Sequence, residues 1–501
     1  MTKIIISYKD YVHCNIKGLN QFDIMNLVKK FKVFIPSSRY TPKYKLGIWD
    51  GCINFFNVNG NTYVNLVPEI LESINLKNYE GIEYIYPNNL IQEPKLIGDI
   101  DSQYLSDLIW YEGHRLEGQP VILEEHQVRC INSLLNNPRG ILSAATGAGK
   151  SLCCAALCRK VQEYGRIVLV VPSKDLCQQT ADELKFTGLD VGIVGMGIRE
   201  FGHQVTVCTW QTINSLERRK IQEYLSVEEL QKLTEDVVCL IFDETHIASG
   251  NEIKKVLEQT FKNVPIRWGL TGTVPKEKSE YMNLMISLGK TVEEKVVAKE
   301  LQDKGFLSNC QVNCIRLDDK TKFMSWTDEK EYISNDKIRM KFISNIISGI
   351  VQSSKNTLVL IDRIKTGETL EKMLIENGVD AIFLSGSVKT KKRFEEYEKV
   401  KTQDNKCIIA IDKIAATGLN IPRLFNVVFI DYGKSFTKII QSIGRGLRRA
   451  SDKDFVTIYD ISNCTKYSKK HFNERIKYYE EAQYPYGIFE IPEQGWKSTV
   501  K

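Results

Sequence analysis

The chain lacks any apolar run approaching the ~20 residues that an α-helix needs to cross a bilayer. Its opening run, Ile4–Ile6, is followed almost at once by Lys9 and Asp10, which leaves it too short for a secretion signal. Hydrophobic residues make up 43% of the chain and charged residues 26%, as is typical of a globular protein. We therefore expect a cytoplasmic protein with no membrane partner, located in the host cytoplasm if the source is viral.

The sequence also lacks the Cys-x-x-Cys pairs from which zinc sites are usually built, although it holds 13 cysteines. Cys153, Cys154 and Cys158 fall on a helix-compatible run, where cysteine most often acts as a small buried apolar residue. We expect reduced structural thiols and no zinc site.

Basic charge is concentrated at the start of the chain. The net charge is +6, and residues 1–60 hold nine lysines and arginines against three aspartates. Between Phe31 and Phe56 this charge alternates with aromatic residues, a mixture that can neutralise phosphates and stack on exposed bases. Lys43, Lys45 and Trp49 are our predicted nucleic-acid contacts. A small α+β domain with an aromatic core and a solvated lysine face explains the same pattern, and both interpretations stay open.

A glycine-rich turn between an apolar run and a helix-compatible run lies from Ala144 to Ser151. Backbone N–H groups in such a turn can cradle phosphate oxygens, while the lysine reaches the outer phosphates and the serine hydroxyl holds Mg²⁺. The residues predicted to bind ATP here are Thr146, Gly147, Ala148, Gly149, Lys150 and Ser151. Because Ala144 stands where the full pattern has glycine, the turn alone also fits a plain strand-to-helix connection.

An acidic pair further along the chain supports the prediction of a nucleotide site. The apolar run Val237–Phe242 ends in Asp243 and Glu244, so a buried strand would deliver two carboxylates at its carboxyl end. Asp243 is predicted to hold Mg²⁺ together with Ser151, and Glu244 to deprotonate the attacking water. With Lys150, these two carboxylates form the predicted catalytic core of an ATPase.

Alternating apolar runs and helix-length segments predict the domain organisation. From about Ile100 the alternation is typical of a parallel α/β sheet. The runs in question are Gly140–Leu142, Ile167–Val171, Val205–Thr209, Val237–Phe242, Thr357–Ile361, Cys407–Ile411 and Val427–Asp431. We predict a nucleic-acid-binding α+β domain over residues 1–100, an ATP-binding domain over 101–305 and a second α/β domain over 306–501.

The motif Asp243–His246 resembles the DExH box of superfamily 2 helicases, and further motifs of that family follow in order. Residues 171–180, 270–273 and 441–449 resemble its motifs Ia, III and VI, and residues 209–212 resemble the next strand-contacting motif after Ia. The resemblance implies an α/β fold with two RecA-like parallel-sheet motor domains, preceded here by the small α+β domain. It also implies an ATP hydrolase that uses ATP and Mg²⁺.

The resemblance assigns roles to individual residues. Gln441, Arg445 and Arg448 would act in catalysis from the second domain, because an arginine fork stabilises charge on the transferring phosphoryl group. Gly418 would contact ATP, and Gln127 would read adenine, although a glutamine at a helix start fits that position equally well. The predicted nucleic-acid contacts are Pro172, Ser173, Thr209, Gln211 and Thr417. The predicted coupling residues are His246, Thr271, Gly272, Thr273 and Asn420.

The layout, with the Trp-Asp-Gly element at residues 49–51, resembles the recombination helicases of T4-like phages. This implies remodelling of branched DNA in recombination, repair and replication. Single-stranded/duplex junctions, RNA–DNA hybrids and recombination or single-strand-binding proteins are the partners it implies. Two alternatives stay open: a duplex-DNA translocase subunit of a larger complex, and an ATP-gated nucleic-acid-binding or annealing module. The basic, aromatic tail from Lys466 onward is either a further nucleic-acid contact or a docking element.

Overall fold

The structure is a computed structural model. It describes residues 2–498 except 89, 97, 113–115, 220–223, 247–249, 354, 386–394, 397, 401, 412–422, 432, 434–442, 445–446 and 448–451. The chain divides into two units. The first holds residues 1–144 and 149–295, and the second holds residues 145–148 and 296–501. Our domain borders near residues 100 and 305 stay a prediction.

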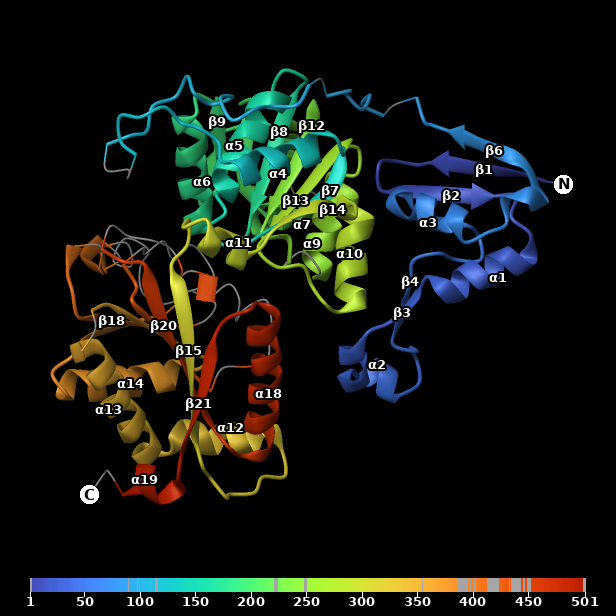
Figure 1. The fold of residues 1–501 in the computed structure, drawn as a ribbon. Coiled ribbons are helices and arrows are strands. Elements are labelled where there is room, and N and C mark those ends of the chain that lie inside the picture. The colour runs from blue at the N-terminus through green and yellow to red at the C-terminus, as the bar shows by residue number, and fades with distance from the viewer. Residues whose placement is uncertain are drawn as a thin grey trace. The chain divides into compact units, whose positions relative to one another are not determined.

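The first unit begins with a small mixed sheet of order β5-β2-β1-β6, in which β1 pairs antiparallel with β2 and parallel with β6. Its strands are β1 (Thr2–Tyr8), β2 (His13–Lys17), β5 (Asn61–Tyr63) and β6 (Tyr79–Ile85). Helices α1 (Gln21–Lys30) and α3 (Val67–Glu72) lie on one face of it (Figure 1). Because side chains alternate along a strand, Ile4 and Ile6 point to the same face and are fully buried beneath the helices.

A short hairpin extends from this sheet. Strands β3 (Lys32–Phe34) and β4 (Cys52–Asn54) pair antiparallel, and residues 35–51 connect them through helices η1 (Pro36–Tyr40) and α2 (Pro42–Lys45). We call residues 35–51 the tip. Gly51 has φ +75°, and a Cβ there would lie 2.4 Å from the Ser38 hydroxyl oxygen, so the position requires glycine.

The larger sheet of the first unit has the order β10-β9-β11-β8-β12-β13-β7-β14. From β9 to β7 every neighbouring pair is parallel, whereas β10 pairs antiparallel with β9. The strands are β7 (Arg139–Ala144), β8 (Arg166–Val171), β9 (Val191–Gly195), β10 (Ile198–Arg199), β11 (Val205–Thr209), β12 (Val237–Asp243), β13 (Ile266–Thr271) and β14 (Thr291–Val296). The helices are α4 (Glu125–Leu135), α5 (Lys150–Val161), α6 (Lys174–Phe186), α7 (Trp210–Arg219), α8 (Tyr224–Thr234), α9 (Asn251–Lys255) and α10 (Lys278–Leu288).

The two sheets of the first unit share a hydrophobic core through α10. Met282, Met285 and Ile286 of this helix are buried in the same cluster as the apolar side chains of the small sheet. The Asn65 side-chain amide also donates to the carbonyls of Met285 and Ile286, at 3.0 and 3.2 Å. The amino-terminal part is therefore packed directly onto the first α/β layer rather than tethered to it.

The second unit holds a seven-stranded sheet of order β17-β18-β16-β19-β20-β15-β21, and every neighbouring pair in it is parallel. The strands are β15 (Asn309–Leu317), β16 (Thr357–Ile361), β17 (Asp380–Leu384), β18 (Lys406–Ile411), β19 (Asn426–Ile430), β20 (Phe455–Asn463) and β21 (Tyr486–Ile491). The described helices are α11 (Ala298–Asp303), α12 (Trp326–Asn335), α13 (Lys337–Ser353), α14 (Ile364–Glu376), α18 (Lys466–Glu481) and α19 (Glu493–Lys497).

The chain's tail completes this sheet. Strand β21 pairs with β15, and Trp496 of α19 is fully buried and donates its indole N–H to the Asp318 carbonyl at 2.7 Å. Residues 486–497 of the tail are therefore docked on the second unit, whereas the exposed lysines at the start of α18 leave the nucleic-acid alternative open. Each apolar run predicted from the sequence lies on a strand, except that Asp431 directly follows β19; strands covered on both faces are apolar along their whole length.

Candidate ATP and nucleic-acid sites

Three neighbouring strands of the first unit bring the predicted ATP residues to one edge. In the sheet β13 lies between β12 and β7, with Asp243 opposite Leu270 and Thr271 opposite Ser143. The glycine turn after β7, the acidic pair after β12 and the threonine after β13 thus meet at the carboxyl edge, where parallel sheets bind their ligands.

The glycine turn has the conformation that a phosphate loop requires. Gly147 and Gly149 have φ values of +90° and +79°, in the left-handed region that glycine favours. Lys150 is the first residue of α5, and its ammonium group donates to the Ala144 carbonyl at 3.1 Å. The amino terminus of α5 follows directly, so its N–H groups and dipole favour an anion here.

The acidic pair after β12 fits a divalent cation. The backbone N–H of Glu244, which has φ +52°, donates to a carboxylate oxygen of Asp243 at 2.9 Å. Burial and then the charge of Glu244 raise the pKa of Asp243 to about 7, against the opposing effect of Lys150. A raised carboxyl pKa means that the ionised carboxylate lacks compensating positive charge, which a bound cation would supply. Carboxylate and hydroxyl oxygens suit Mg²⁺, so Asp243 and Ser151 could hold it.

A threonine and a histidine link the acidic pair to β13. The Nδ1 atom of His246 lies 3.3 Å from a carboxylate oxygen of Glu244 and 3.4 Å from the Thr271 hydroxyl. The same hydroxyl donates to the Thr273 carbonyl at 2.8 Å and accepts from the Thr273 N–H at 3.2 Å. The structure thus joins four of the predicted coupling residues, with Gly272 between the two threonines, to the predicted base.

Gln127 is buried rather than a surface residue at a helix start. Its side-chain carbonyl accepts the Glu124 N–H at 2.9 Å and forms a capping box at the start of α4. Its amide nitrogen points at the glycine turn, because a Cβ on Gly149 would lie 2.2 Å from it. Both predicted roles therefore remain compatible with the geometry: one end caps the helix and the other faces the nucleotide loop.

The predicted nucleic-acid residues at the carboxyl ends of β8 and β11 lie in or beside one cavity of about 320 Å³. Thr209 and Gln211 line it, Gln211 donates to the Pro172 carbonyl at 3.1 Å, and Ser173 caps the adjoining helix α6. Lys174, Arg199 and Arg219 also line this cavity. None of these three cations was among the predicted contacts. Lys174 could have been predicted from the sequence, because it lies within motif Ia, directly after Ser173.

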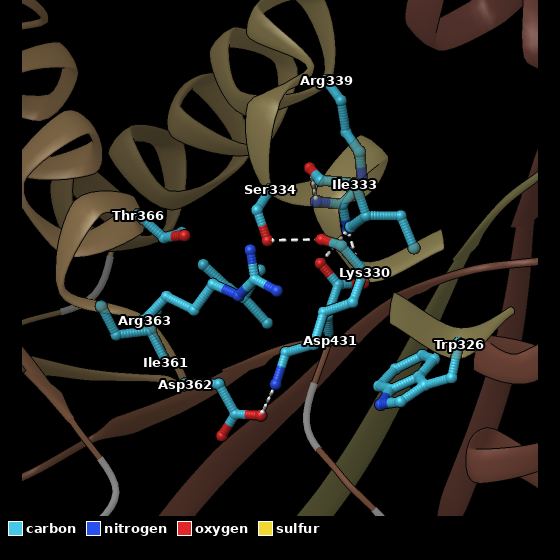
Figure 2. Close-up of a pocket in the computed structure, with 11 residues that line it drawn as sticks. Trp326, Lys330, Ile333, Ser334, Arg339, Ile361, Asp362, Arg363, Thr366 and Asp431 are labelled. Carbon is cyan, nitrogen blue, oxygen red and sulfur yellow. Dashed lines mark hydrogen bonds and ion pairs between the residues drawn. The ribbon is translucent and has the colours of Figure 1, made fainter. Parts of the chain in front are cut away.

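A second basic pocket lies at the carboxyl ends of the neighbouring strands β16 and β19 in the second unit (Figure 2). Lys330 is paired there with Asp362 at 3.0 Å, and the buried Arg339 with Asp431 at 2.6 Å. Figure 2 shows Arg363 reaching into the pocket between Ser334 and Asp362. Within the described part of the chain the Arg363 side chain forms no ion pair or hydrogen bond, so its charge is available to an anion.

The tip presents its own exposed side chains. Lys43 and Lys45 are exposed, whereas Trp49 is partly buried and donates its indole N–H to the Cys52 carbonyl at 3.0 Å. Three side chains that were not among the predicted contacts are the most exposed apolar groups of the tip. They are Tyr40 at 81%, Leu46 at 72% and Ile48 at 72%.

Other predictions concern groups elsewhere in the chain. Six predicted site residues lie outside the described residues: Gln441, Arg445, Arg448, Thr417, Gly418 and Asn420.

All 13 cysteines are free thiols and nearly all are buried, as predicted. Over the described ranges, no group of three His, Cys, Asp or Glu side chains is arranged to bind a metal. None of the helices that the structure describes is long and apolar enough to traverse a bilayer.

Three protein families match consecutive parts of the chain. Residues 3–82 match "DNA helicase UvsW, N-terminal", residues 121–276 match "Type III restriction enzyme, res subunit", and residues 339–450 match "Helicase conserved C-terminal domain". The ATP-dependent DNA helicase uvsW of Enterobacteria phage T4 is 26% identical over 497 residues, which cover 95% of this chain and 93% of that protein.

Solved structures share the fold. Dbp5 of S. cerevisiae, bound to RNA and ADP BeF3, has a TM-score of 0.53 at 17% identity and covers 76% of this chain and 92% of its own. The Type ISP restriction-modification enzyme LlaBIII, bound to DNA, has a TM-score of 0.53 at 14% identity. It covers 85% of this chain and 36% of its own.

Three findings define the class of protein. They are the parallel sheets, the glycine turn at the same sheet edge as an acidic pair, and the family matches in consecutive order along the chain. The chain is an ATP-dependent helicase of superfamily 2, and hence an ATP hydrolase, built on two RecA-like domains with a small α+β part before them. Within that class it resembles UvsW of phage T4 over nearly its whole length.

Proposed function

We propose that the chain is an ATP-driven DNA motor that remodels branched DNA. Its reactions would be regression of stalled forks, migration of Holliday junctions, unwinding of D-loops and R-loops, and annealing of single strands. The observation that carries this proposal is the amino-terminal part. It presents a basic, apolar tip and shares its core with the ATP-binding layer through α10. The match of residues 3–82 to the amino-terminal family of a DNA helicase supports DNA as the substrate.

The ATP step uses groups that converge at one edge of the first sheet. The glycine turn and Lys150 would hold the triphosphate, and Asp243 and Ser151 would hold Mg²⁺, which would neutralise charge on it. Glu244 orients the attacking water and accepts its proton, while His246 holds the Glu244 carboxylate in place. Gln441, Arg445 and Arg448 keep their predicted roles at the γ-phosphoryl group, and Gly418 keeps its predicted contact with ATP.

Each unit by itself offers cations to a DNA strand. In the first unit Lys174, Arg199 and Arg219 line the same cavity as Thr209 and Gln211, so cations face the predicted strand contacts. In the second unit Arg363 offers a guanidinium, without an ion-pair partner among the described residues, at the carboxyl ends of β16 and β19. Phosphate contacts of this kind position a strand without reading its sequence, which suits a motor that moves along any DNA. Thr417 is expected to add to this grip, and Asn420 keeps its predicted coupling role.

The test is the ATPase rate of the full chain with no polynucleotide, single-stranded DNA, duplex DNA, a four-way junction and RNA. We expect stimulation chiefly by the junction, and its loss in Lys150→Ala. Stimulation chiefly by RNA would contradict the proposal. Stimulation by duplex DNA alone would favour the translocase subunit, and no stimulation at all would favour the binding or annealing module.

A further inference from the structure

An aromatic surface joins two helices of the second unit beside the Arg363 pocket. Trp326, the first residue of α12, packs edge-on against His471 of α18 with ring centres 4.6 Å apart, and against Tyr467 at 6.2 Å. Trp326 also lines the pocket itself, on the side opposite Thr366 (Figure 2). The three rings are partly exposed, so this surface is not part of the core.

A buried carboxylate fixes these rings. Glu329 of α12 is fully buried, and one of its oxygens accepts the Tyr467 N–H at 3.0 Å. The other accepts the N–H and the hydroxyl of Ser468, at 2.7 and 2.8 Å. These are N–H groups of the first turn of α18, which lack partners inside the helix. Because Glu329 supplies those partners, α12 and α18 are held together and the position of Trp326 is set in advance of any ligand.

Cations surround the rings. The Lys330 ammonium lies 5.8 Å from the Trp326 ring centre and that of Lys466 lies 5.1 Å from the Tyr467 ring centre. Lys466, Lys469 and Lys470 are exposed at the start of α18 and form no ion pair with the described residues. Cations at a helix amino terminus oppose its dipole, so these lysines cost stability where they stand. An anionic partner on this face would remove that cost.

We propose that Trp326 is a stacking platform for an unpaired base of the DNA strand whose backbone contacts Arg363. Lys466 and Lys470 contact phosphates of the same strand. The indole N–H forms no hydrogen bond within the described ranges, and the ring combines an apolar face with adjacent cations, which is the composition of single-strand binding surfaces. This proposal rests on the proposed function, because it assumes that the ligand is DNA.

The experiment measures affinity for a fluorescent oligothymidylate and for the same length of duplex, in the full chain without nucleotide. We expect Trp326→Ala to weaken single-strand binding about 5- to 150-fold, the usual value of one base–aromatic stack. Duplex affinity should stay unchanged, because paired bases do not present a free face. Trp326→Phe keeps a ring and should lose less. The matched control is Phe489→Ala, which removes another exposed aromatic side chain from β21 of the same unit.

The outcomes separate the platform from the broader proposal. Equal losses of affinity for single-stranded and duplex DNA in Trp326→Ala would show that Trp326 only supports the structure. That result would overturn the proposed stacking role. An unchanged single-strand affinity in Trp326→Ala, with normal wild-type binding, would also overturn it and leave the DNA motor intact. Wild-type protein that binds no single-stranded DNA would overturn both. Equal melting temperatures of wild type, Trp326→Phe and Trp326→Ala would confirm that the variants fold.

Discussion

At the scale of single residues, Glu244 is the group on which hydrolysis should depend most sharply. Its backbone N–H donates to the Asp243 carboxylate, and its own carboxylate lies 3.3 Å from the Nδ1 atom of His246. Glu244→Gln keeps the shape and removes the base, so we expect ATP binding to persist while kcat falls roughly 10²- to 10⁴-fold. Binding of a fluorescent ATP analogue and steady-state hydrolysis measure the two effects separately.

The control is Glu72→Gln, an exposed carboxylate at the end of α3 in the same unit. It should change neither quantity. If Glu244→Gln lost nucleotide binding and hydrolysis together, the carboxylate would be holding the turn together rather than activating water, and its assignment as the base would be wrong.

Gln127 allows its two roles to be separated. A glutamate at this position can still accept the Glu124 N–H and keep the capping box, but it has no amide to donate. If the amide reads adenine, Gln127→Glu should raise the KM for ATP about 5- to 10-fold more than the KM for GTP. Repulsion between the new charge and the phosphates would raise both equally, so the ratio of the two KM values is the measurement.

An unchanged ratio with an unchanged melting temperature would assign Gln127 to the helix cap alone. Sequence reasoning could not decide this, because the two ends of one side chain serve different neighbours. Only the fold places the amide nitrogen against Gly149.

At the scale of elements, the link between α12 and α18 depends on one buried side chain. Glu329→Ala would leave the N–H groups of Tyr467 and Ser468 without acceptors. We expect it to lower the free energy of unfolding of the second unit by about 1–3 kcal/mol. It should also weaken single-strand binding, because Trp326 would no longer be held beside His471. Chemical denaturation and oligothymidylate binding are the measurements.

The exposed Glu331 lies two residues further along the same helix. Glu331→Ala should change the free energy of unfolding by no more than about 0.5 kcal/mol, as is usual for a surface position. Equal destabilisation by both variants would show that helix propensity in α12, rather than the cap on α18, is what matters.

Elements differ in how far their sequence predicts them. Runs such as Ile167–Val171 and Leu358–Ile361 are apolar throughout, and they form buried parallel strands as expected. The strands of the small sheet are half-buried or short, so that their limits depend on the partners they find; β5 has only three residues. The residues of the ATP site could be predicted from motifs because they lie in short, continuous segments at the ends of three strands. The Arg363 pocket and the Trp326 surface join segments more than a hundred residues apart, and pattern alone does not bring these together.

At the scale of the whole molecule, the amino-terminal part and the ATP-binding layer form one body. Ile286 of α10 is fully buried in the cluster that also holds Ile4 and Ile6. A force or a ligand acting on the tip therefore reaches the first motor sheet through packed side chains, not through a flexible linker. Under the proposed function, this arrangement would let the tip hold a branch point at a fixed position while ATP turnover moves a strand.

The prediction that follows concerns Lys43 and Lys45 together. The variant Lys43→Ala/Lys45→Ala should weaken binding to a four-way junction and raise the DNA concentration needed for half-maximal ATPase, while the basal ATPase stays unchanged. For each lysine that neutralises a phosphate, its removal should reduce the slope of log affinity against log salt by about 0.9. Lys77→Ala removes an exposed lysine from η3 (Leu76–Asn78) of the same part and should leave the slope unchanged. An unaltered slope in the double variant would mean that the tip's lysines are only a solvated face. In that case the exposed Tyr40, Leu46 and Ile48 would hold a junction without help from these two charges.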